Sequence, residues 1–157
     1  MELQKAEKKA KELIQKHKPD YSFVWDNAKV RFGCCNYRKK QISLSRELVQ
    51  LNTENDVVDV ILHEIAHAIV GAGNGHNNIW RNKAIEIGCD GCRCYGNEVK
   101  TPKGKYQYQC PNCNRVINRY RRIKRPLSCG ECCNKYNSGR FTEKYAFKRK
   151  YEVKKNE

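Results

Sequence analysis

The 157-residue sequence has no long apolar segment. None of its stretches approaches the roughly 20 consecutive apolar residues of a membrane-spanning helix, and the mean hydropathy is −0.90. The N-terminal stretch MELQKAEKKAKELIQKHKPD alternates charge and lacks the unbroken apolar run of a signal peptide. No internal repeat is present, and the length suits one domain of about 100 residues with a small appendage. We therefore expect an intracellular, cytoplasmic protein without a membrane partner.

Acidic residues are scarce in the last third of the chain. Residues 1–100 contain 16 lysines and arginines against 13 aspartates and glutamates, whereas residues 101–157 contain 16 against 4. Most of the formal net charge of +15 therefore belongs to the C-terminal third. Such an excess attracts polyanions, with nucleic acid as the first candidate and an anionic membrane surface as the second. A lysine-rich surface that only maintains solubility is the alternative.

The first part of the chain has the pattern of a small α+β domain. Apolar residues between Leu3 and Ile14 lie on one face of an amphipathic helix that ends before Pro19. Residues that favour β-structure then predict a small sheet with strands near 21–25, 29–34 and 41–44.

Helices are predicted after the sheet. Ser45 can cap a short helix through about Leu51, and the following TEND resembles a capping box. The helix that it opens, over about 54–70, is apolar nearly all round and should be buried. A glycine-rich loop follows, and NIWRNKAIEIG predicts another helix that stops at Gly88. Because these glycines follow a helix instead of leading from a strand into one, they do not suggest a phosphate-binding loop.

The buried helix carries the motif His63-Glu64-Ile65-Ala66-His67. Two histidines four residues apart share one helix face, where both imidazoles can bind one Zn²⁺. Zinc lowers the pKa of a bound water towards ~7, and Glu64 is placed to accept its proton as a general base. Unpaired buried polar groups are costly, so these residues need a role. A core helix whose polar side chains find hydrogen bonds is the alternative.

Two residues are candidates for a third metal ligand. His76 lies beyond the glycine loop, which can fold back over the helix, and 18 residues separate Glu86 from the second histidine of the motif. The metzincin pattern fails, because Val70 and Gly73 occupy the positions of its glycine and third histidine. We favour His76, since Glu86 can instead pair with a lysine three residues earlier.

A second metal-binding pattern lies in the C-terminal third. Cys110-Pro-Asn-Cys113 and Cys129-Gly-Glu-Cys132 are separated by 15 residues, which fits a four-thiolate zinc ribbon. Four thiolates leave no open position on the ion, so this zinc would be structural and would support folding of a segment with few apolar residues. Cys133 adjoins the second pair, but the repeated spacing favours Cys132.

The remaining cysteines form two further groups. They are Cys34, Cys35, Cys89, Cys92 and Cys94. Free thiols are the simpler interpretation, and a third metal site is the alternative.

Basic and aromatic residues cluster around the predicted ribbon. Such side chains neutralise phosphates and stack on bases of single-stranded or distorted nucleic acid, without sequence-specific readout. The candidates are Tyr106, Tyr108, Arg115, Arg119, Tyr120, Arg121, Arg122, Lys124 and Arg125. Tyr106 and Tyr108 would share one face of a strand, although either can instead pack the ribbon's interior.

Composition also predicts the domain boundaries. Residues 95–104, YGNEVKTPKG, have the glycine, proline and polar content of a linker. We therefore expect a first domain over residues 1–98, a zinc-ribbon subdomain over 99–147 and a mobile basic tail over 148–157.

The order of these motifs resembles that of the SprT-like (Spartan-type) zinc metalloprotease family. The similar stretches are KVRFGCCNYRKKQISLSREL, ILHEIAHAIVGAGNGHNNIWRNKA and YQYQCPNCNRVINRYRRIKRPLSCGEC. The resemblance implies a zincin-like metalloprotease domain followed by a zinc ribbon. It also implies proteolysis of DNA-associated proteins, best described for proteins crosslinked to DNA. Asn77 departs from the pattern, because many relatives have glycine there.

Carried over by position, the resemblance implies two zinc ions per chain. The catalytic zinc would be bound by His63, His67 and His76, with Glu64 as the general base, and the structural zinc by Cys110, Cys113, Cys129 and Cys132. DNA and proteins bound to it would be the partners. A further donor for the oxyanion is expected, with Tyr37, Tyr95 and Arg81 as candidates. A non-catalytic zinc-dependent nucleic-acid-binding module and a general peptidase are the alternative functions.

Overall fold

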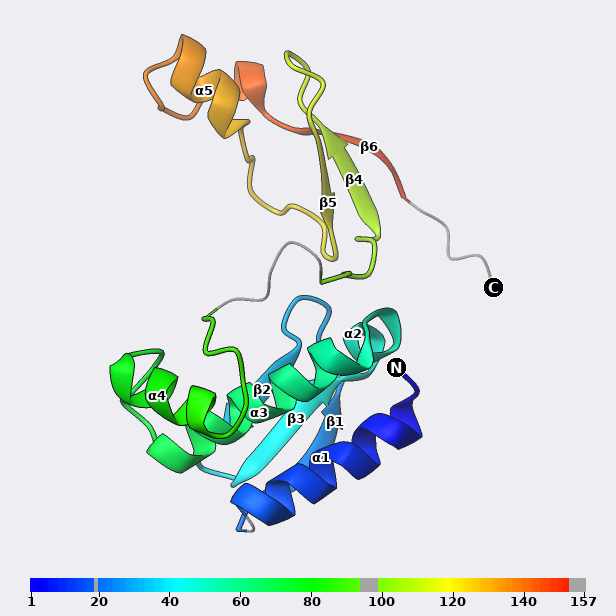
Figure 1. The fold of residues 1–157 in the computed structure, drawn as a ribbon. Helices are drawn as coiled ribbons and strands as arrows, with labels where there is room; N and C mark the ends of the chain where they lie inside the picture. Colours follow the sequence, from blue (N-terminus) through cyan, green and yellow to red (C-terminus); the bar gives the residue numbers. More distant parts are fainter. Residues whose placement is uncertain (19, 94–98, 153–157) are drawn as a thin grey trace. The chain divides into compact units, whose positions relative to one another are not determined.

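The computed structural model describes residues 1–18, 20–93 and 99–152 (Figure 1). The chain divides into two compact units, Met1–Pro102 and a second unit that begins at Lys103. Both mix helices with a small sheet, so the α+β prediction holds at this level. No helix in the described ranges is long and apolar enough to cross a membrane.

The sheet of the first unit has three strands. They are β1 (Ser22–Asp26), β2 (Gly33–Asn36) and β3 (Gln41–Ser45), in the order β1-β3-β2. β1 runs parallel to β3, whereas β2 is antiparallel to it and forms an edge of the sheet. The first and third strands match the prediction within one residue. The second begins at Gly33 instead of residue 29, because the chain bends after β1, where the Asp26 carboxylate accepts a hydrogen bond from the Ala28 N–H (2.9 Å).

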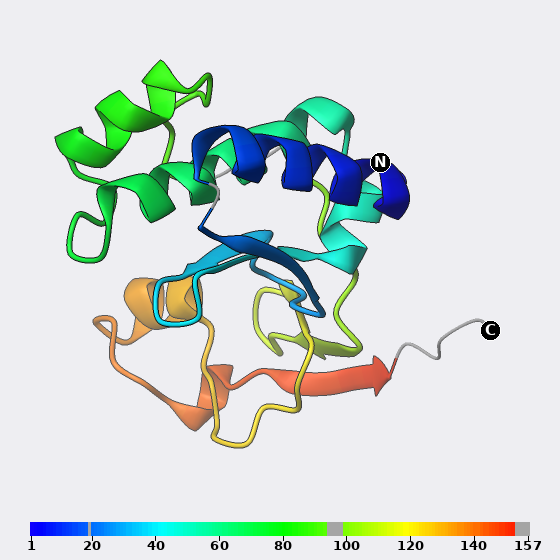
Figure 2. The same cartoon turned by 90° about the horizontal axis from the view of Figure 1, so that it is seen from below.

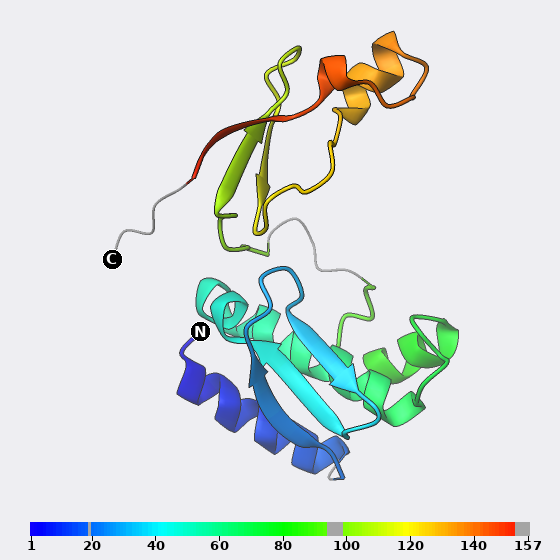
Figure 3. The same ribbon diagram turned by 180° about the vertical axis from the view of Figure 1, so that it is seen from behind.

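In the described part of this unit, four helices accompany the sheet. They are α1 (Leu3–His17), α2 (Arg46–Leu51), α3 (Glu54–Val70) and α4 (Asn78–Glu86). α1 and α3 pack against each other on one face of the sheet, as the turned view in Figure 2 shows, and Figure 3 shows the sheet from its other face. α4 packs against α3. The predicted helix positions are therefore confirmed.

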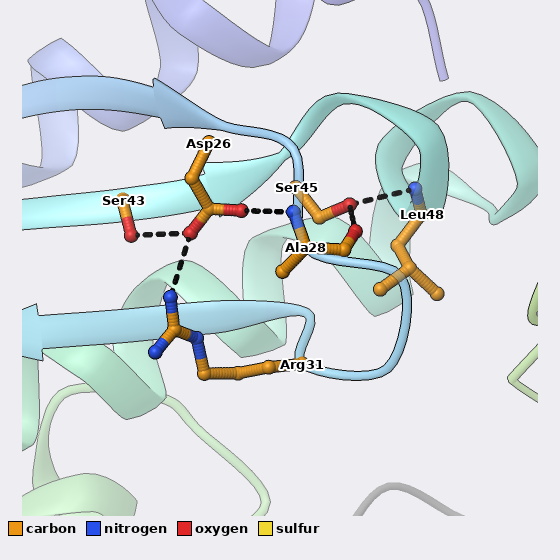
Figure 4. A network of polar contacts seen from close by, with 6 residues as sticks. All are labelled: Asp26, Ala28, Arg31, Ser43, Ser45 and Leu48. Atoms are coloured by element: carbon orange, nitrogen blue, oxygen red, sulfur yellow. Dashed lines mark hydrogen bonds and ion pairs between the residues drawn. The ribbon is translucent and has the colours of Figure 1, made fainter. Parts of the chain in front are cut away.

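Side-chain caps fix where α2 and α3 begin. The Ser45 hydroxyl accepts a hydrogen bond from the Leu48 N–H and donates one to the Ala28 carbonyl (Figure 4). Thr53 and Asp56 make the predicted capping box at the start of α3. Each such cap stabilises a helix by about 1 kcal/mol. The caps thus set the register of the helix that carries the histidine motif.

The core of the first unit lies between the helices and the sheet. α3 contributes most to it, and its buried apolar partners come from α1, α2 and β3. Its fully buried members include Ala6, Ala10, Phe32, Ile42, Leu44, Leu48, Val49, Val57, Val60, Ile61 and Ile65. Burying one such aliphatic side chain contributes about 1.5–3 kcal/mol. The histidine motif therefore lies on the helix that contributes most to this core.

The second unit has a separate three-stranded antiparallel sheet. Its strands are β4 (Tyr106–Gln109), β5 (Val116–Arg119) and β6 (Lys148–Glu152), in the order β5-β4-β6, and α5 (Gly130–Tyr136) follows the third ribbon cysteine. The prediction of a mobile tail from residue 148 is wrong for residues 148–152, since they pair with β4. Residues 153–157 lie outside the described residues.

The first unit extends beyond its predicted end at residue 98. Val99 packs against the core of the first unit. The Asn52 side chain accepts a hydrogen bond from the Lys100 N–H and donates one to its carbonyl, at 2.7 and 2.9 Å. These contacts hold the segment before Lys103 on the first unit.

Candidate active site and metal centres

The three histidines of the motif come from α3 and the loop after it. α3 places His63 and His67 one turn apart, and the loop returns His76 to them. Gly71, Gly73 and Gly75 all have positive φ in this loop, at 79°, 100° and 49°. Glycine adopts such values without steric strain, which lets the short loop reverse direction.

Asn77 closes the same loop from the other side. It has an extended backbone (φ −74°, ψ −177°) and is the N-cap of α4, where its side chain accepts a hydrogen bond from the Trp80 N–H at 3.1 Å. The departure from glycine at this position is therefore harmless, because the backbone there requires no left-handed conformation. The cap fixes the residue directly after His76.

The three imidazoles converge on one point. The Nε2 atom of His76 lies 3.0 Å from that of His63 and 3.1 Å from that of His67. Three nitrogens bound to one tetrahedral Zn²⁺ at ~2.0–2.1 Å would be separated by about 3.3 Å. The donor set and its spacing therefore fit a single zinc ion.

The ionisation of the histidines also suits a metal. Burial and the neighbouring imidazoles lower the pKa of His63 and of His67 to about 4. Burial and then Arg93 lower the pKa of His76. Neutral rings keep a lone pair for a cation. The buried Nδ1 of His67 has no hydrogen-bond partner among the described residues. Hydrogen bonds between the rings cannot satisfy all three Nε2 atoms at once, because the three atoms face one another.

Trp80 forms a wall of this cluster. Its ring lies 4.6 Å from the ring of His63, 5.2 Å from that of His67 and 4.6 Å from that of His76, measured between centroids. It is only 1% exposed. This role was not predicted from the sequence. The sequence signal for this role was a large aromatic residue three positions after Asn77, the N-cap of α4, where its side chain can face α3.

Glu64 is buried between α3 and β2. A Cβ atom added at Gly33 would lie 2.8 Å from Glu64 Cγ, 2.9 Å from its Oε1 and 2.9 Å from Val60 Cγ1. β2 can therefore approach α3 this closely only because residue 33 has no side chain. This glycine was also missed, although a glycine at a predicted strand is itself a sign of a close approach.

The pKa of the Glu64 carboxyl group is raised to about 7. Burial causes the increase, and the Cys35 N–H and the Arg31 guanidinium oppose it. A divalent cation on the adjacent imidazoles would lower it again. A carboxyl group that can exchange protons near neutral pH is suited to general acid–base chemistry.

An open pocket of about 380 Å³ surrounds these groups. Besides Glu64 and the three histidines, its lining consists of Arg31, Gly33, Cys34, Cys35, Tyr37 and Arg93. Of the three candidate oxyanion donors, Tyr37 lines the pocket, whereas Arg81 on α4 does not. Tyr95 lies outside the described residues.

The Arg31 side chain is held by a network at the end of β1 (Figure 4). Its Nη2 donates to Asp26 Oδ2 at 3.1 Å, and the Ser43 hydroxyl donates to the same oxygen at 2.8 Å. The Ala28 N–H occupies the other carboxylate oxygen. This network joins the β1–β2 connection to β3. It holds the Arg31 side chain at the pocket lining, with its guanidinium group bound to Asp26.

Glu86 does not contribute to the histidine cluster. Its carboxylate is exposed and pairs with Lys83 Nζ at 2.6 Å, three residues earlier. His76 is therefore the one of the two candidates that the fold brings to His63 and His67.

A larger cavity, of about 710 Å³, lies beside the start of α3. Its lining includes Asp59, Cys89 and Asp90, which form a third group close enough to share an ion. Burial raises the pKa of Cys89 to about 12, so the thiol keeps its proton, and Asp59 Oδ1 accepts a hydrogen bond from the Asp90 N–H. Asp59 and Asp90 already accept hydrogen bonds from backbone N–H groups. This cavity is therefore a weaker candidate for an active site than the histidine pocket, although it is larger.

The four predicted ribbon cysteines come together in the second unit. Cys110 Sγ lies 3.7 Å from Cys132 Sγ, and Cys113 Sγ lies 3.7 Å from Cys129 Sγ. Zn–S bonds of ~2.3 Å in a tetrahedron require S···S distances of about 3.8 Å. Cys133 instead donates to the Ser128 hydroxyl. The arrangement fits one zinc ion held by the four sulfurs, and the nine cysteines that the structure describes are all free thiols.

The thiols of this cluster differ in acidity. Burial opposes ionisation of Cys110, but hydrogen bonds from the backbone of Cys113 and Asn112 lower its pKa to about 7. The Asn112 side chain lowers the pKa of Cys132, yet burial and the neighbouring thiols outweigh it and raise that pKa to about 12. Four close sulfurs cannot all ionise unless a cation compensates them.

The residues predicted to bind nucleic acid fall into two groups. The basic ones, Arg115, Arg119, Arg121, Arg122, Lys124 and Arg125, are all exposed, and Tyr120 is half-buried. Tyr108 is only 6% exposed, and its hydroxyl accepts a hydrogen bond from the Ile123 N–H at 3.0 Å. Tyr108 is thus an interior residue and is not on the expected surface.

Tyr106 lies among basic side chains. The cationic groups of Lys105, Arg122 and Arg149 lie 5.6, 5.7 and 5.5 Å from the centre of its ring. Arg149 was not among the predicted contacts, because it belongs to the segment that was expected to be a tail. Strand β6 brings it to Tyr106.

Comparison with known proteins places the first unit. The sequence pattern of the SprT-like family matches residues 3–103. The chain belongs to the SprT-like family. The matched range includes Glu64 and all three clustered histidines, and it ends before the first ribbon cysteine. Membership in this family supports a metalloprotease-type function.

Two other comparisons add little. A comparison with curated proteins gives no match. Among solved structures, the chain is similar to "Crystal structure of the metallopeptidase zymogen of Pyrococcus abyssi abylysin", with 17% identity over 55% of this chain and 88% of that chain and a TM-score of 0.41.

Proposed function

We propose that this protein is a zinc-dependent endopeptidase that acts on DNA-associated proteins, with proteins crosslinked to DNA as the substrate type. One observation carries the enzymatic part. A buried glutamate with a pKa of about 7 lies beside three neutral imidazoles whose Nε2 atoms converge, within one open pocket. This combination supplies a metal site and a proton acceptor at the same place.

In the proposed reaction, water attacks the carbonyl carbon of a peptide bond. Zinc held by His63, His67 and His76 would act as a Lewis acid and make that water more acidic. The Glu64 carboxylate accepts the proton of the attacking water and later donates it to the leaving amine nitrogen. Gly33 keeps the carboxyl group at its position against β2, and Trp80 orients the imidazoles.

The DNA part of the proposal rests on the second unit. Its segment carries 16 of the 32 basic residues and only 4 acidic ones, and its predicted phosphate-binding side chains are exposed. Such a surface favours single-stranded or distorted DNA without sequence preference. The cysteine cluster would hold a structural zinc that keeps this surface folded.

A non-catalytic nucleic-acid-binding module is the second candidate. Glu64 argues against it, because a purely structural metal site does not require a buried carboxyl group at this position. Desolvation of that group disfavours its charged form. A general peptidase is the third candidate, and it predicts cleavage that does not depend on DNA.

One experiment distinguishes these functions. Zinc content and cleavage of an unstructured protein would be measured for the native protein and Glu64→Gln, with and without single-stranded DNA. Our proposal predicts two zinc ions per chain, cleavage stimulated by DNA, and a variant that keeps zinc and DNA binding but loses cleavage. Equal cleavage by both proteins would refute the role of Glu64. Absence of cleavage in both would favour the binding module, and cleavage insensitive to DNA the general peptidase.

A further inference from the structure

The pocket contains a donor that the proposed function leaves without a task. We propose that the Tyr37 hydroxyl is a catalytic group that donates a hydrogen bond to the oxyanion developing on the substrate's carbonyl oxygen. The inference rests on the proposed peptidase function and assigns its missing donor.

The position of Tyr37 is fixed by the strand that also positions Glu64. Tyr37 directly follows β2 and begins the turn to β3, where the Asn36 side chain accepts a hydrogen bond from the Lys39 N–H at 3.0 Å. β2 packs against Glu64 at Gly33 and donates to its carboxylate from the Cys35 N–H. The short, paired strand β2 therefore contacts Glu64 of α3 and leads directly to Tyr37, and both residues line the pocket. A rigid element of this kind gives the accurate positioning that catalysis requires.

The other donors on the pocket lining are less suitable. Arg31 already donates to Asp26. Arg93 is exposed, and both arginines carry a positive charge that a bound dication would repel. The Cys34 and Cys35 thiols are weak donors. Tyr37 is half-buried, is neutral and has one hydroxyl donor.

The phenol keeps its proton at the pH of the reaction. Burial, Cys35 and Glu64 raise the pKa of Tyr37 above its ordinary value. A neutral donor in a partly desolvated pocket favours the charged oxygen of the transition state over the ground-state carbonyl. Its removal should therefore lower kcat and leave KM nearly unchanged.

The test compares Tyr37→Phe with the native protein on an unstructured protein substrate. We expect kcat to fall about 100-fold or more, the usual loss for one oxyanion donor, with an unchanged zinc content. A peptide phosphonamidate, which imitates the tetrahedral transition state, should bind more weakly by the same factor. Tyr37→His, which retains a donor, should recover part of kcat. Tyr21→Phe is the matched control, because Tyr21 contacts Cys35 without lining the pocket.

Three outcomes would overturn this inference. They are native kcat in Tyr37→Phe, an increase in KM alone, and a loss of zinc, which would make Tyr37 a structural residue. If the native protein cleaves, Glu64→Gln does not and Tyr37→Phe behaves as native, only the assignment of Tyr37 fails. If native protein and Glu64→Gln cleave equally, the proposed function itself fails.

Discussion

The two candidate metal sites of this protein are supported in opposite ways. The histidine cluster lies on α3, which is embedded in a core of aliphatic residues from several helices and the sheet. The buried cluster around the sulfurs of the second unit contains three of the proposed ligands, Cys110, Cys129 and Cys132, together with Cys133 and Tyr145. In the first unit, packing positions the metal ligands. In the second, the candidate ligands make up most of the buried cluster, so a bound ion would supply stability that packing does not.

The largest expected effect of this difference is on zinc removal. Cys129→Ser, or a strong chelator, should unfold the second unit, because a structural zinc contributes an apparent ~10–16 kcal/mol of binding free energy. The first unit should stay folded. Amide hydrogen exchange of the full chain measures both units at once. Persistent protection of β4 and β5 without zinc would show that the second unit does not depend on the ion. Loss of protection in α3 would show that the first unit does.

A second test concerns the third histidine. His76→Ala should weaken zinc binding at the first unit by more than about 100-fold, the upper range for losing even an indirect partner of a metal site. The first unit should remain folded, because His76 lies on a loop outside the core. Glu86→Ala is the matched control and should bind zinc normally, since Glu86 only pairs with Lys83. Equal affinities, measured by competition with a zinc-binding dye, would exclude His76 as a ligand.

A third test examines how closely β2 packs on α3. Gly33→Ala should destabilise the first unit by about 1–3 kcal/mol through overpacking, and it should displace Glu64 and lower cleavage. Gly130→Ala introduces the same methyl group where no atom beyond its chain neighbours and its own helix backbone lies within 4 Å, and it should be neutral or slightly stabilising. Urea unfolding and substrate cleavage measure the two effects. Native stability and activity in Gly33→Ala would contradict the contact.

The smallest expected effect is a pH dependence of the zinc-free first unit. His63 and His67 have pKa values lowered from 6.5 to about 4. Between these pH values the unfolded chain binds more protons than the folded one, so stability should fall as pH decreases from about 6.5 to about 4. Above that range these histidines should contribute no pH dependence. Urea unfolding in a chelator measures it, in a Glu64→Gln background that removes the opposing titration of Glu64.

The control for this dependence is a second substitution at the cluster. Adding His67→Asn to the Glu64→Gln background should make the slope of stability against pH shallower. An unchanged slope would show that the titration arises elsewhere.

Much of the first unit could be predicted from local patterns. The caps at Ser45 and Thr53 set the helix starts correctly, because capping depends on residues within four positions. The choice of His76 over Glu86 agrees with the observed arrangement, since a glycine loop restricts where the chain can return. The C-x₂-C spacing alone was enough to choose Cys132 over Cys133 as a member of the sulfur cluster.

The features that local patterns missed all depend on contacts between distant segments. The close approach at Gly33 requires knowing that β2 crosses Glu64. The burial of Tyr108 depends on its contact with Ile123 in the connection after β5, and the strand at Lys148–Glu152 depends on pairing with β4. In a basic, apolar-poor segment these pairings leave little hydrophobic periodicity to detect.

The contact between Val60 and Gly33 has a consequence for proton affinity. The same close packing that excludes water from Glu64 raises the pKa of its carboxyl group from 4.5 to about 7. The size of the Val60 side chain, one turn away on α3, therefore influences the pKa of the Glu64 carboxyl group. A smaller residue at position 60 would admit solvent and return the carboxyl group towards ordinary acidity, without altering any polar atom of the pocket.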